Sequence, residues 1–312
     1  MELRKDYILD RWVIISEKRG KRPDQFKQEK DQFPEETCYF CPGNESQTPP
    51  EIGRIEKNGS WTMRWFPNKF SFVESQGNPV VKTADRFFTY SSPYGEHEVF
   101  VETPDHQKQL HDLSIDEIKE VLKVYSNRIK ELSARSEYVV VFKNHGLDGG
   151  TSLVHSHSQI ASLNIVPPSI MDETELGFKE GRCLYCDILN IEKKSFRRVF
   201  ENDSFVSFCA YASRFNFEIW VFPKRHINNP NDMSEKEYED LATMMKKILL
   251  RLGELEADYN YGLHYAPKGK QLHFHIEIMP RIAKWAGMEL SSGIIVNVVS
   301  PENAAKFYRG EQ

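Results

Sequence analysis

Cysteine and histidine residues occur twice along this chain in the same order, and these residue types can bind metal or act as nucleophiles. Each half contains a Cys-x-x-Cys pair, then a single histidine, then a His-x-His pair. The residues are Cys38, Cys41, His106, His155 and His157 in the first half, and Cys183, Cys186, His226, His273 and His275 in the second. The interval from the single histidine to the pair is nearly equal in the two halves. We interpret this pattern as a duplication of one unit.

Two thiolates and two imidazoles are typical ligands of a tetrahedral zinc ion. The first predicted set is Cys38, Cys41, His106 and His155, and the second is Cys183, Cys186, His226 and His273. The ligands are much further apart in sequence than in a zinc finger, so each ion would join distant parts of its unit and stabilise the fold. The alternative is that the Cys-x-x-Cys pairs are redox motifs or buried cysteines. The fifth cysteine, Cys209, lies in an apolar stretch and is expected to be buried.

The second histidine of each pair is left over from a four-ligand site. A neutral imidazole attacks phosphorus readily and leaves it readily, so it can carry a nucleotidyl group between two acceptors. In the first half Gln159 follows His157 on the same face of a strand and can donate its amide to a phosphoryl oxygen. In the second half Glu277 follows His275, and its charge would repel a phosphate. We therefore predict that His157 and Gln159 are catalytic and that the second half is structural.

Two other interpretations are open at this point. His157 alone could be a core histidine with its hydrogen bonds satisfied. The whole chain could be a non-catalytic, zinc-stabilised nucleotide-binding protein in which both His-x-His pairs are structural. The difference between Gln159 and Glu277 argues against this, since a purely structural duplication gives no reason for an amide on one side only.

The elements around these residues repeat as well. Residues 114–134 and 234–256 are predicted helices, each with an N-terminal serine and a glutamate three residues later that form a capping box. The predicted strands are 65–73, 98–102 and 138–142 in the first half and 200–208, 217–222 and 259–265 in the second, each half then ending in the strand of its His-x-His pair. We predict an α+β fold with packed helices on antiparallel sheets, and two domains, 1–170 and 171–312.

Length and charge narrow the class of protein. The chain has 312 residues, 39% of them hydrophobic and 28% charged, which suits a globular protein of two domains. Its net charge is −5, so we expect no nucleic-acid partner. The N-terminus lacks the apolar core of a signal peptide and no segment is apolar enough to span a membrane. We expect a cytoplasmic protein without a membrane partner.

Several motifs together resemble galactose-1-phosphate uridylyltransferases, a branch of the histidine triad superfamily with the active-site motif His-Pro-His-x-Gln. The resemblance covers nearly the whole chain and is carried by residues 19–23, 38–44, 66–70, 103–106, 142–146, 155–159 and 271–275. It implies a tandem pair of histidine-triad-like units, of which the first is catalytic and the second is structural and binds the hexose. It also implies a homodimer whose active sites are shared between subunits.

The resemblance further implies a ping-pong reaction. His157 would attack the α-phosphorus of UDP-glucose, release glucose 1-phosphate, and pass the uridylyl group to galactose 1-phosphate, while Gln159 steadies the phosphoryl group. The nucleotide and phosphates would be bound by Arg19, Arg22, Asn68, Asn144 and Ser152. Glu289 would bind the hexose hydroxyls. Two arginines in one short turn also form a plausible clamp for a diphosphate.

The chain departs from the family pattern at three positions. Ser156 replaces the usual proline between the histidines, Lys69 stands where many bacterial members have an aspartate near the nucleoside, and Met288 replaces a tyrosine of the hexose pocket. Because of Lys69 and Met288, the resemblance does not assign the nucleotide base or the sugar. Lys69 and the second Cys-x-x-Cys pair favour a rival activity, an ADP-glucose phosphorylase in which orthophosphate is the acceptor.

Some family members hold iron in the second half. That site would correspond to Glu173, His264, His273 and His275 in this chain. Because the second Cys-x-x-Cys pair and His226 compete for His273, we favour zinc in both halves over this iron site.

Overall fold

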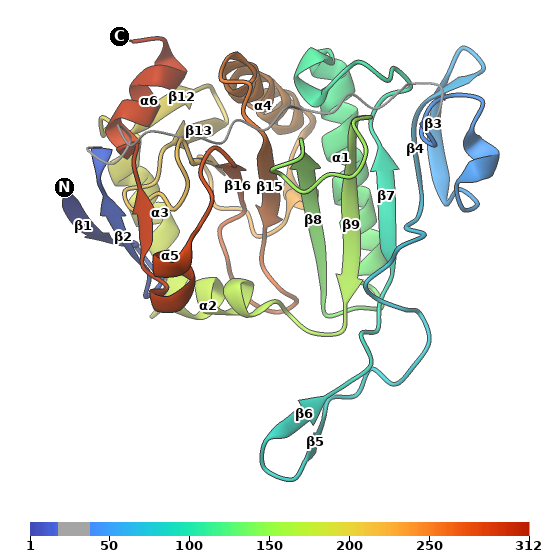
Figure 1. Ribbon diagram of the computed structural model, residues 1–312, viewed down its shortest axis with the longest axis horizontal. Coiled ribbons are helices and arrows are strands. Elements are labelled where there is room, and N and C mark those ends of the chain that lie inside the picture. The colour runs from blue at the N-terminus through green and yellow to red at the C-terminus, as the bar shows by residue number, and fades with distance from the viewer. Residues whose placement is uncertain (18–37, 312) are drawn as a thin grey trace.

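Two sets of five strands join edge to edge into one antiparallel sheet in the part of the chain that the computed structural model describes, residues 1–17 and 38–311 (Figure 1). From the outer edge inwards the first set is β3 (Gly53–Lys57), β4 (Ser60–Pro67), β7 (His97–Val101), β9 (His157–Leu163) and β8 (Tyr138–His145). The second is β12 (Arg198–Glu201), β13 (Phe205–Phe208), β14 (Ile219–Pro223), β16 (His275–Pro280) and β15 (Tyr259–His264). Corresponding strands occupy corresponding places, so the predicted duplicated α+β fold is confirmed.

The seam between the two sets is a pair of strands, β8 and β15, which hydrogen-bond to each other in antiparallel register. Aromatic side chains cross it. The rings of Tyr138 and Tyr265 stack with centroids 4.5 Å apart, and the hydroxyl oxygens of Tyr125 and Tyr261 lie 2.7 Å apart in the interior. The two halves therefore share one continuous hydrophobic core.

Two long helices, α1 (Ile115–Leu132) and α4 (Glu235–Glu254), lie against the sheet beside each other (Figure 1). Both begin at the predicted capping boxes, in which Ser114 and Ser234 accept a hydrogen bond from the backbone of the glutamate three residues later. Their buried residues are mostly apolar and recur at helical spacing, so each helix buries one face. The serine caps and the apolar period thus place both helices as predicted.

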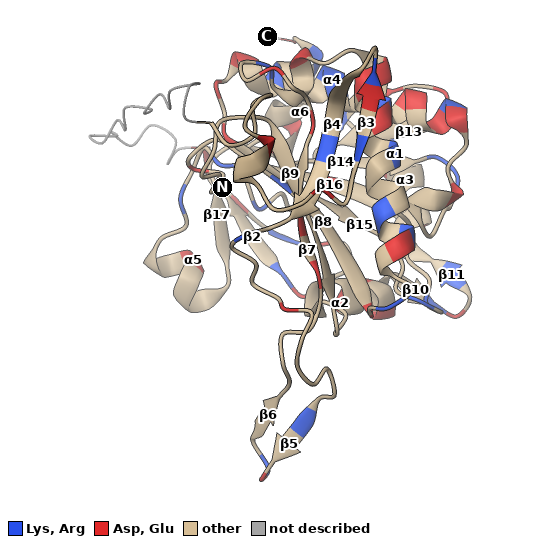
Figure 2. Ribbon diagram, turned by 90° about the vertical axis from the view of Figure 1, so that its right-hand side faces the viewer, with Lys and Arg blue, Asp and Glu red and all other residues tan. Residues whose placement is uncertain are grey.

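The remaining elements surround this core. They are β1 (Glu2–Lys5), β2 (Trp12–Ile15) and β17 (Ile295–Asn297) in a small sheet, β10 (Phe178–Lys179) with β11 (Arg182–Cys183), the 3-10 helices η3 (Glu45–Gln47), η4 (Leu110–Asp112) and η5 (Pro230–Asp232), and the helices α2 (Pro168–Gly177), α3 (Leu184–Glu192), α5 (Gly287–Ser292) and α6 (Pro301–Arg309). The hairpin β5 (Lys82–Ala84) and β6 (Phe88–Tyr90) projects away from the body in both views (Figures 1 and 2). Figure 2 shows acidic and basic residues interspersed along the ribbon. No helix in the described ranges is long and apolar enough to cross a membrane.

Two strand predictions differ from the structure. Residues 200–208 were expected to form one strand, but they contribute to two, β12 and β13, because the Asn202 side chain accepts hydrogen bonds from the backbone N–H groups of Ser204 and Phe205 and turns the chain. The strand predicted at 65–73 instead ends at Pro67. The side chain of Asn68 accepts a hydrogen bond from the backbone N–H of Phe70, which makes a second turn of the same kind.

Candidate active site and metal centres

His157 is the first residue of β9 and is only 7% exposed. Its Nδ1 atom lies 2.8 Å from the backbone carbonyl oxygen of His155. Because a carbonyl oxygen only accepts hydrogen bonds, Nδ1 carries the proton and Nε2 carries the lone pair. Burial lowers the pKa of His157 to about 4, so the ring is neutral at pH 7. A neutral imidazole of fixed tautomer is the form that can attack a phosphorus atom.

His157 and Gln159 line a cavity of about 450 Å³. Its wall also includes Phe66 of β4 and Val99 of β7, and the ring of Phe40 meets the His157 ring edge-on with centroids 5.2 Å apart. The other lining residues are Tyr39, Gln47, Thr48, Pro49, Asn68, Lys69, Phe70, Ser152 and Leu153. Aromatic walls with a few polar groups, around a volume of this size, can accommodate a nucleotide beside the imidazole.

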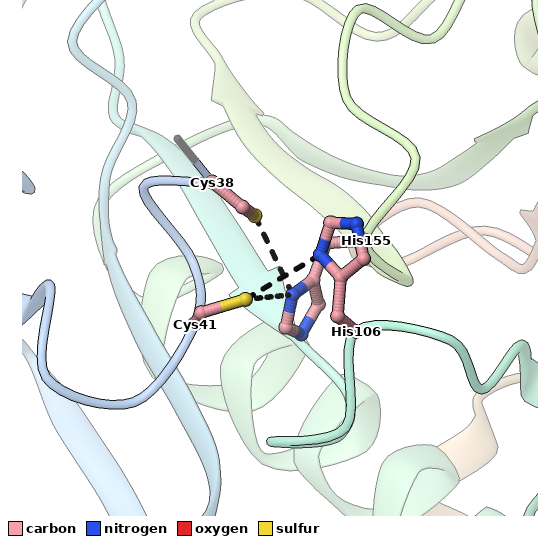
Figure 3. A group of neighbouring side chains, drawn as sticks. All are labelled: Cys38, Cys41, His106 and His155. Atoms are coloured by element: carbon pink, nitrogen blue, oxygen red, sulfur yellow. Dashed lines mark hydrogen bonds between the residues drawn. The ribbon is translucent and has the colours of Figure 1, made fainter. Parts of the chain in front are cut away.

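The first group of candidate metal ligands is Cys38, Cys41, His106 and His155, whose side chains converge (Figure 3), and Phe40, between the two cysteines, lines the cavity. The sulfur of Cys41 lies 3.4 Å from Nδ1 of His106 and 3.6 Å from Nδ1 of His155, and the sulfur of Cys38 lies 3.6 Å from Nδ1 of His155. These separations match the edges of a tetrahedron around one zinc-sized ion. Nε2 of His155 lies 2.7 Å from the carbonyl oxygen of Thr103, which directs Nδ1 towards the centre. The four residues therefore fit a metal ion.

The second group repeats this geometry. The sulfur of Cys186 lies 3.4 Å from Nδ1 of both His226 and His273, and Cys183 completes the group. Nε2 of His273 lies 3.0 Å from the carbonyl oxygen of Pro223, so the ring presents Nδ1 to the group, as in the first half. Both groups predicted from the sequence are thus brought together as clusters that can bind a metal ion.

A third group does not match the predicted iron ligands. His273 lies in the second cysteine group, and Glu173, His264 and His275 gather instead with Glu277. Glu173 and Glu277 each lie 3.9 Å from Nε2 of His275, and Nδ1 of His264 lies 2.9 Å from Glu173. Two carboxylates and two imidazoles that converge in this way can also hold a metal ion.

His275, the second-half counterpart of His157, does not line the cavity, whereas His157 does. His275 is fully buried, and its ring stacks on Phe222 with centroids 4.6 Å apart. The neighbouring Glu277 accepts a hydrogen bond of 2.5 Å from Arg214. A buried ring beside two carboxylates does not offer a lone pair to a phosphate, so these contacts favour the first half as the reactive one.

Only some of the other predicted site residues line the cavity. Asn68 and Ser152 line the cavity, whereas Asn144 lies on β8 and accepts a hydrogen bond from Asn260. Glu289 lies on α5, is absent from the cavity wall, and caps its own helix by accepting from the backbone N–H of Ala286 at 2.9 Å. Lys69 lines the cavity, and Met288 accompanies Glu289 on α5. Arg19 and Arg22 lie outside the described residues.

Three features near the site have no counterpart among the sequence predictions. Phe40 stands between the two cysteines of the first pair and packs on His157. His97 is buried and contacts Gln159. Lys143 and Glu102 form a buried ion pair beneath β9. The position of Phe40 within Cys-Tyr-Phe-Cys was a usable signal, but the other two depend on strand pairing that the sequence does not specify.

Comparison with known proteins extends over the whole chain. The family model described as "Galactose-1-phosphate uridyl transferase, N-terminal domain" matches residues 1–167, and a second, "Domain of unknown function (DUF4921)", matches residues 95–307. The ADP-glucose phosphorylase of Arabidopsis thaliana is 34% identical, covering 99% of this chain and 92% of that protein. The galactose-1-phosphate uridylyltransferase of Haemophilus influenzae is 32% identical, covering 86% and 81%.

Solved structures agree. The Arabidopsis thaliana ADP-glucose phosphorylase with bound ADP-glucose has a TM-score of 0.85 at 28% identity and covers 100% of this chain and 99% of its own. A uridylyltransferase structure has a TM-score of 0.77 at 29% identity and covers 99% and 98%. The fold, the His157 site and these relatives define the chain as a nucleotidyltransferase. It belongs to the galactose-1-phosphate uridylyltransferase family.

Proposed function

We propose that this enzyme transfers a uridylyl group from UDP-glucose to galactose 1-phosphate through a covalent intermediate on His157. The observation that carries the proposal is the neutral His157 imidazole at the cavity wall, with Nδ1–H donated to a carbonyl oxygen and Nε2 available. Nε2 forms a bond to the α-phosphorus while the bond from that phosphorus to the glucose 1-phosphate oxygen breaks. The leaving oxygen takes the electron pair, and no proton has to be removed from the nucleophile.

In the second half of the reaction an oxygen of galactose 1-phosphate attacks the same phosphorus. The bond to Nε2 breaks, its electron pair returns to the ring, and UDP-galactose leaves. Gln159 donates its amide N–H to a non-bridging phosphoryl oxygen, where negative charge grows in both steps. Asn68 and Ser152, which also line the cavity, and Arg19, Arg22 and Asn144 are assigned to the nucleotide and its phosphates.

A second candidate is an ADP-glucose phosphorylase, in which His157 takes the adenylyl group and orthophosphate receives it. The specific support is the 34% identity to the Arabidopsis thaliana ADP-glucose phosphorylase and the likeness of the two folds. The chemistry at His157 is the same in both candidates. They differ in the base that the cavity accepts and in whether a sugar accompanies the acceptor phosphate.

For the metals, we propose zinc in both Cys₂His₂ groups, with a role in folding rather than in the reaction. The support is the donor set itself, since two thiolates and two imidazoles with tetrahedral spacing suit zinc. The first ion would hold the loop that carries Phe40 against the cavity. The Glu173 group, with no thiolate, is the place where iron would bind if the chain carries a third ion.

We also propose a homodimer, with Glu289 acting on the hexose in the partner's active site. The support is that Glu289 is absent from the wall of the cavity of its own chain, and that α5 lies towards the β12 side of the molecule, away from β9 (Figure 1). Light scattering tests the dimer. If Glu289 acts in this way, Glu289→Gln raises KM for galactose 1-phosphate and leaves nucleotidylation of His157 unchanged, whereas an unchanged KM removes Glu289 from the site.

Intact-protein mass spectrometry after brief incubation with UDP-glucose or with ADP-glucose tests the main proposal. A uridylyl adduct that is labile to acid, and that is discharged by galactose 1-phosphate, supports the transferase. An adenylyl adduct alone, discharged by orthophosphate, supports the phosphorylase. The absence of an adduct with either sugar nucleotide contradicts the covalent mechanism.

A further inference from the structure

His97 on β7 is buried, with 5% of its surface exposed, and it contacts the amide of Gln159. Its Nε2 atom lies 2.8 Å from Oε1 of Gln159. The side-chain nitrogen of Asn68 lies 3.3 Å from the same oxygen. The Oε1 atom of Gln159 therefore contacts His97 on β7 and Asn68, which directly follows β4.

The orientation of these groups follows from one backbone N–H. The N–H of Phe70 can only donate, and it lies 2.9 Å from Oδ1 of Asn68, which fixes the Asn68 oxygen on that side. The Asn68 nitrogen then lies 3.3 Å from two possible acceptors, Oε1 of Gln159 and Nε2 of His97. Because a carboxamide oxygen has two lone pairs and an imidazole nitrogen has one, the Gln159 oxygen is the atom that can accept from both of its neighbours. The Nε2 atom of His97, which faces that oxygen, must carry a proton. Burial also lowers the pKa of His97 and keeps the ring neutral, with this single N–H.

We propose that His97 is a positioning residue that holds the Gln159 carboxamide by its oxygen and thereby directs the amide N–H₂ to the phosphoryl group. This inference rests on the proposed nucleotidyl transfer at His157. Without the donor from His97, the carboxamide of Gln159 retains only the longer contact from Asn68 and can rotate by half a turn. In the rotated state an oxygen lone pair would face the phosphate and repel it.

The surroundings of Gln159 can be compared with those of Glu277, the equivalent residue in the second half. Val99 pairs with Gln159, and Trp220 pairs with Glu277, so the position of His97 corresponds to Glu218. There Arg214 donates to both Glu218 and Glu277. A carboxylate is thus held by an arginine in one half, and an amide oxygen is held by a histidine N–H in the other. The donor in each half therefore suits the group that it binds: a charged guanidinium binds the Glu277 carboxylate, and a neutral imidazole N–H binds the Gln159 amide oxygen.

The test compares nucleotidylation rates of His97 variants with UDP-glucose, the donor of the main proposal, using rapid quench and intact mass. His97→Phe keeps a ring against Phe72, and His97→Leu is smaller; both remove the donor. We expect each to slow adduct formation about ten-fold to one hundred-fold, somewhat less than the loss of a whole transition-state donor, with the KM for UDP-glucose nearly unchanged. His97→Gln, which retains an N–H donor, should recover most of the rate.

A double-mutant cycle separates positioning from structure. In the Gln159→Ala background the amide is gone, so His97→Phe should add little further loss. Phe72→Leu is the matched packing control, because Phe72 contacts the His97 ring with centroids 4.2 Å apart and does not bond to Gln159. Its rate should stay near wild type. A wild-type rate in both donor-free variants, or a loss that persists fully without Gln159, would overturn the proposal.

A measurement without turnover distinguishes failure of this inference from failure of the proposed function. The side-chain N–H₂ signals of Gln159 in an amide NMR spectrum, assigned by their absence in Gln159→Ala, should shift and broaden in His97→Phe. If the wild-type enzyme forms no adduct but these signals respond, the proposed reaction is wrong and the positioning contact stands. If the adduct forms and the signals do not respond, the positioning role is wrong.

Discussion

The ammonium nitrogen of Lys143 lies 3.0 Å from the backbone carbonyl oxygen of His157, in the interior beneath the reactive strand. The same nitrogen lies 2.5 Å from Glu102 and 3.0 Å from the hydroxyl of Ser156. Although burial favours a neutral carboxyl, Lys143 holds the pKa of Glu102 below its usual value. Ser156, which stands in place of the family's proline, thus ties the His-x-His backbone to a buried ion pair.

Lys143→Met should lower the free energy of unfolding by about 3–5 kcal/mol, because it leaves the Glu102 charge buried without a partner. Glu102→Gln in the same chain should restore part of this loss, since it removes the uncompensated charge. Urea denaturation in zinc-containing buffer measures both. Lys247→Met, an exposed change on α4, is the control and should stay within about 0.5 kcal/mol of wild type. Equal effects at Lys143 and Lys247 would show that the buried pair contributes nothing.

His157→Ala should abolish the nucleotidyl adduct, whereas His275→Ala, the equivalent change in the second half, should keep it. The reason is that His157 lines the cavity and His275 is enclosed. Intact mass after incubation with UDP-glucose or ADP-glucose checks both variants. An adduct on His157→Ala, or its loss only in His275→Ala, would place the nucleophile in the other half.

Metal analysis of the purified protein should give about two zinc ions per chain. Cys41→Ser and Cys186→Ser should each remove one, since each loses a thiolate of a different group. Cys209→Ala is the matched control, because Cys209 is buried outside both groups, and it should keep two. Each zinc loss should lower the melting temperature. A third equivalent that disappears in Glu173→Gln would be assigned to the Glu173 group.

The stability contribution of Glu237 should depend on pH. The guanidinium of Arg225 lowers the pKa of this capping carboxylate to about 2, from an ordinary value of 4.5. A depressed native pKa means that the stabilisation is present above about pH 4.5 and is lost as the pH falls towards 2. Glu237→Gln should therefore cost about 1 kcal/mol at pH 7 and progressively less below pH 4.5.

Denaturation of wild type and Glu237→Gln over this pH range measures the change, and their difference cancels effects of acid on the metal groups. Glu239→Gln, at an exposed position of the same helix, is the control and should show a small, nearly pH-independent difference. A constant difference between wild type and Glu237→Gln from pH 7 to pH 3 would contradict the assigned pKa.

Some of this protein could be predicted from its sequence because the signals are local. The capping boxes and the apolar periods placed the two long helices within a few residues of their ends. The repeated cysteine and histidine pattern was enough to group eight ligands into two sets, because four ligands of one ion must converge wherever the chain carries them. The alternation of a β-strand put His157 and Gln159 on one face.

Tertiary structure decided the remaining contacts of the site, because these contacts depend on which strands become neighbours. Pairing of β7 with β9 puts His97 beside Gln159, and the neighbouring positions of β7, β8 and β9 bring Glu102 and Lys143 together under His157. His273 precedes β16 and joins one metal group, whereas Glu277 lies within β16 and joins another, and spacing in the sequence does not give this division. The position of Glu289, away from the cavity, likewise follows from where α5 packs. Local sequence thus determined the elements and the ligand types, and the long-range strand order determined their partners.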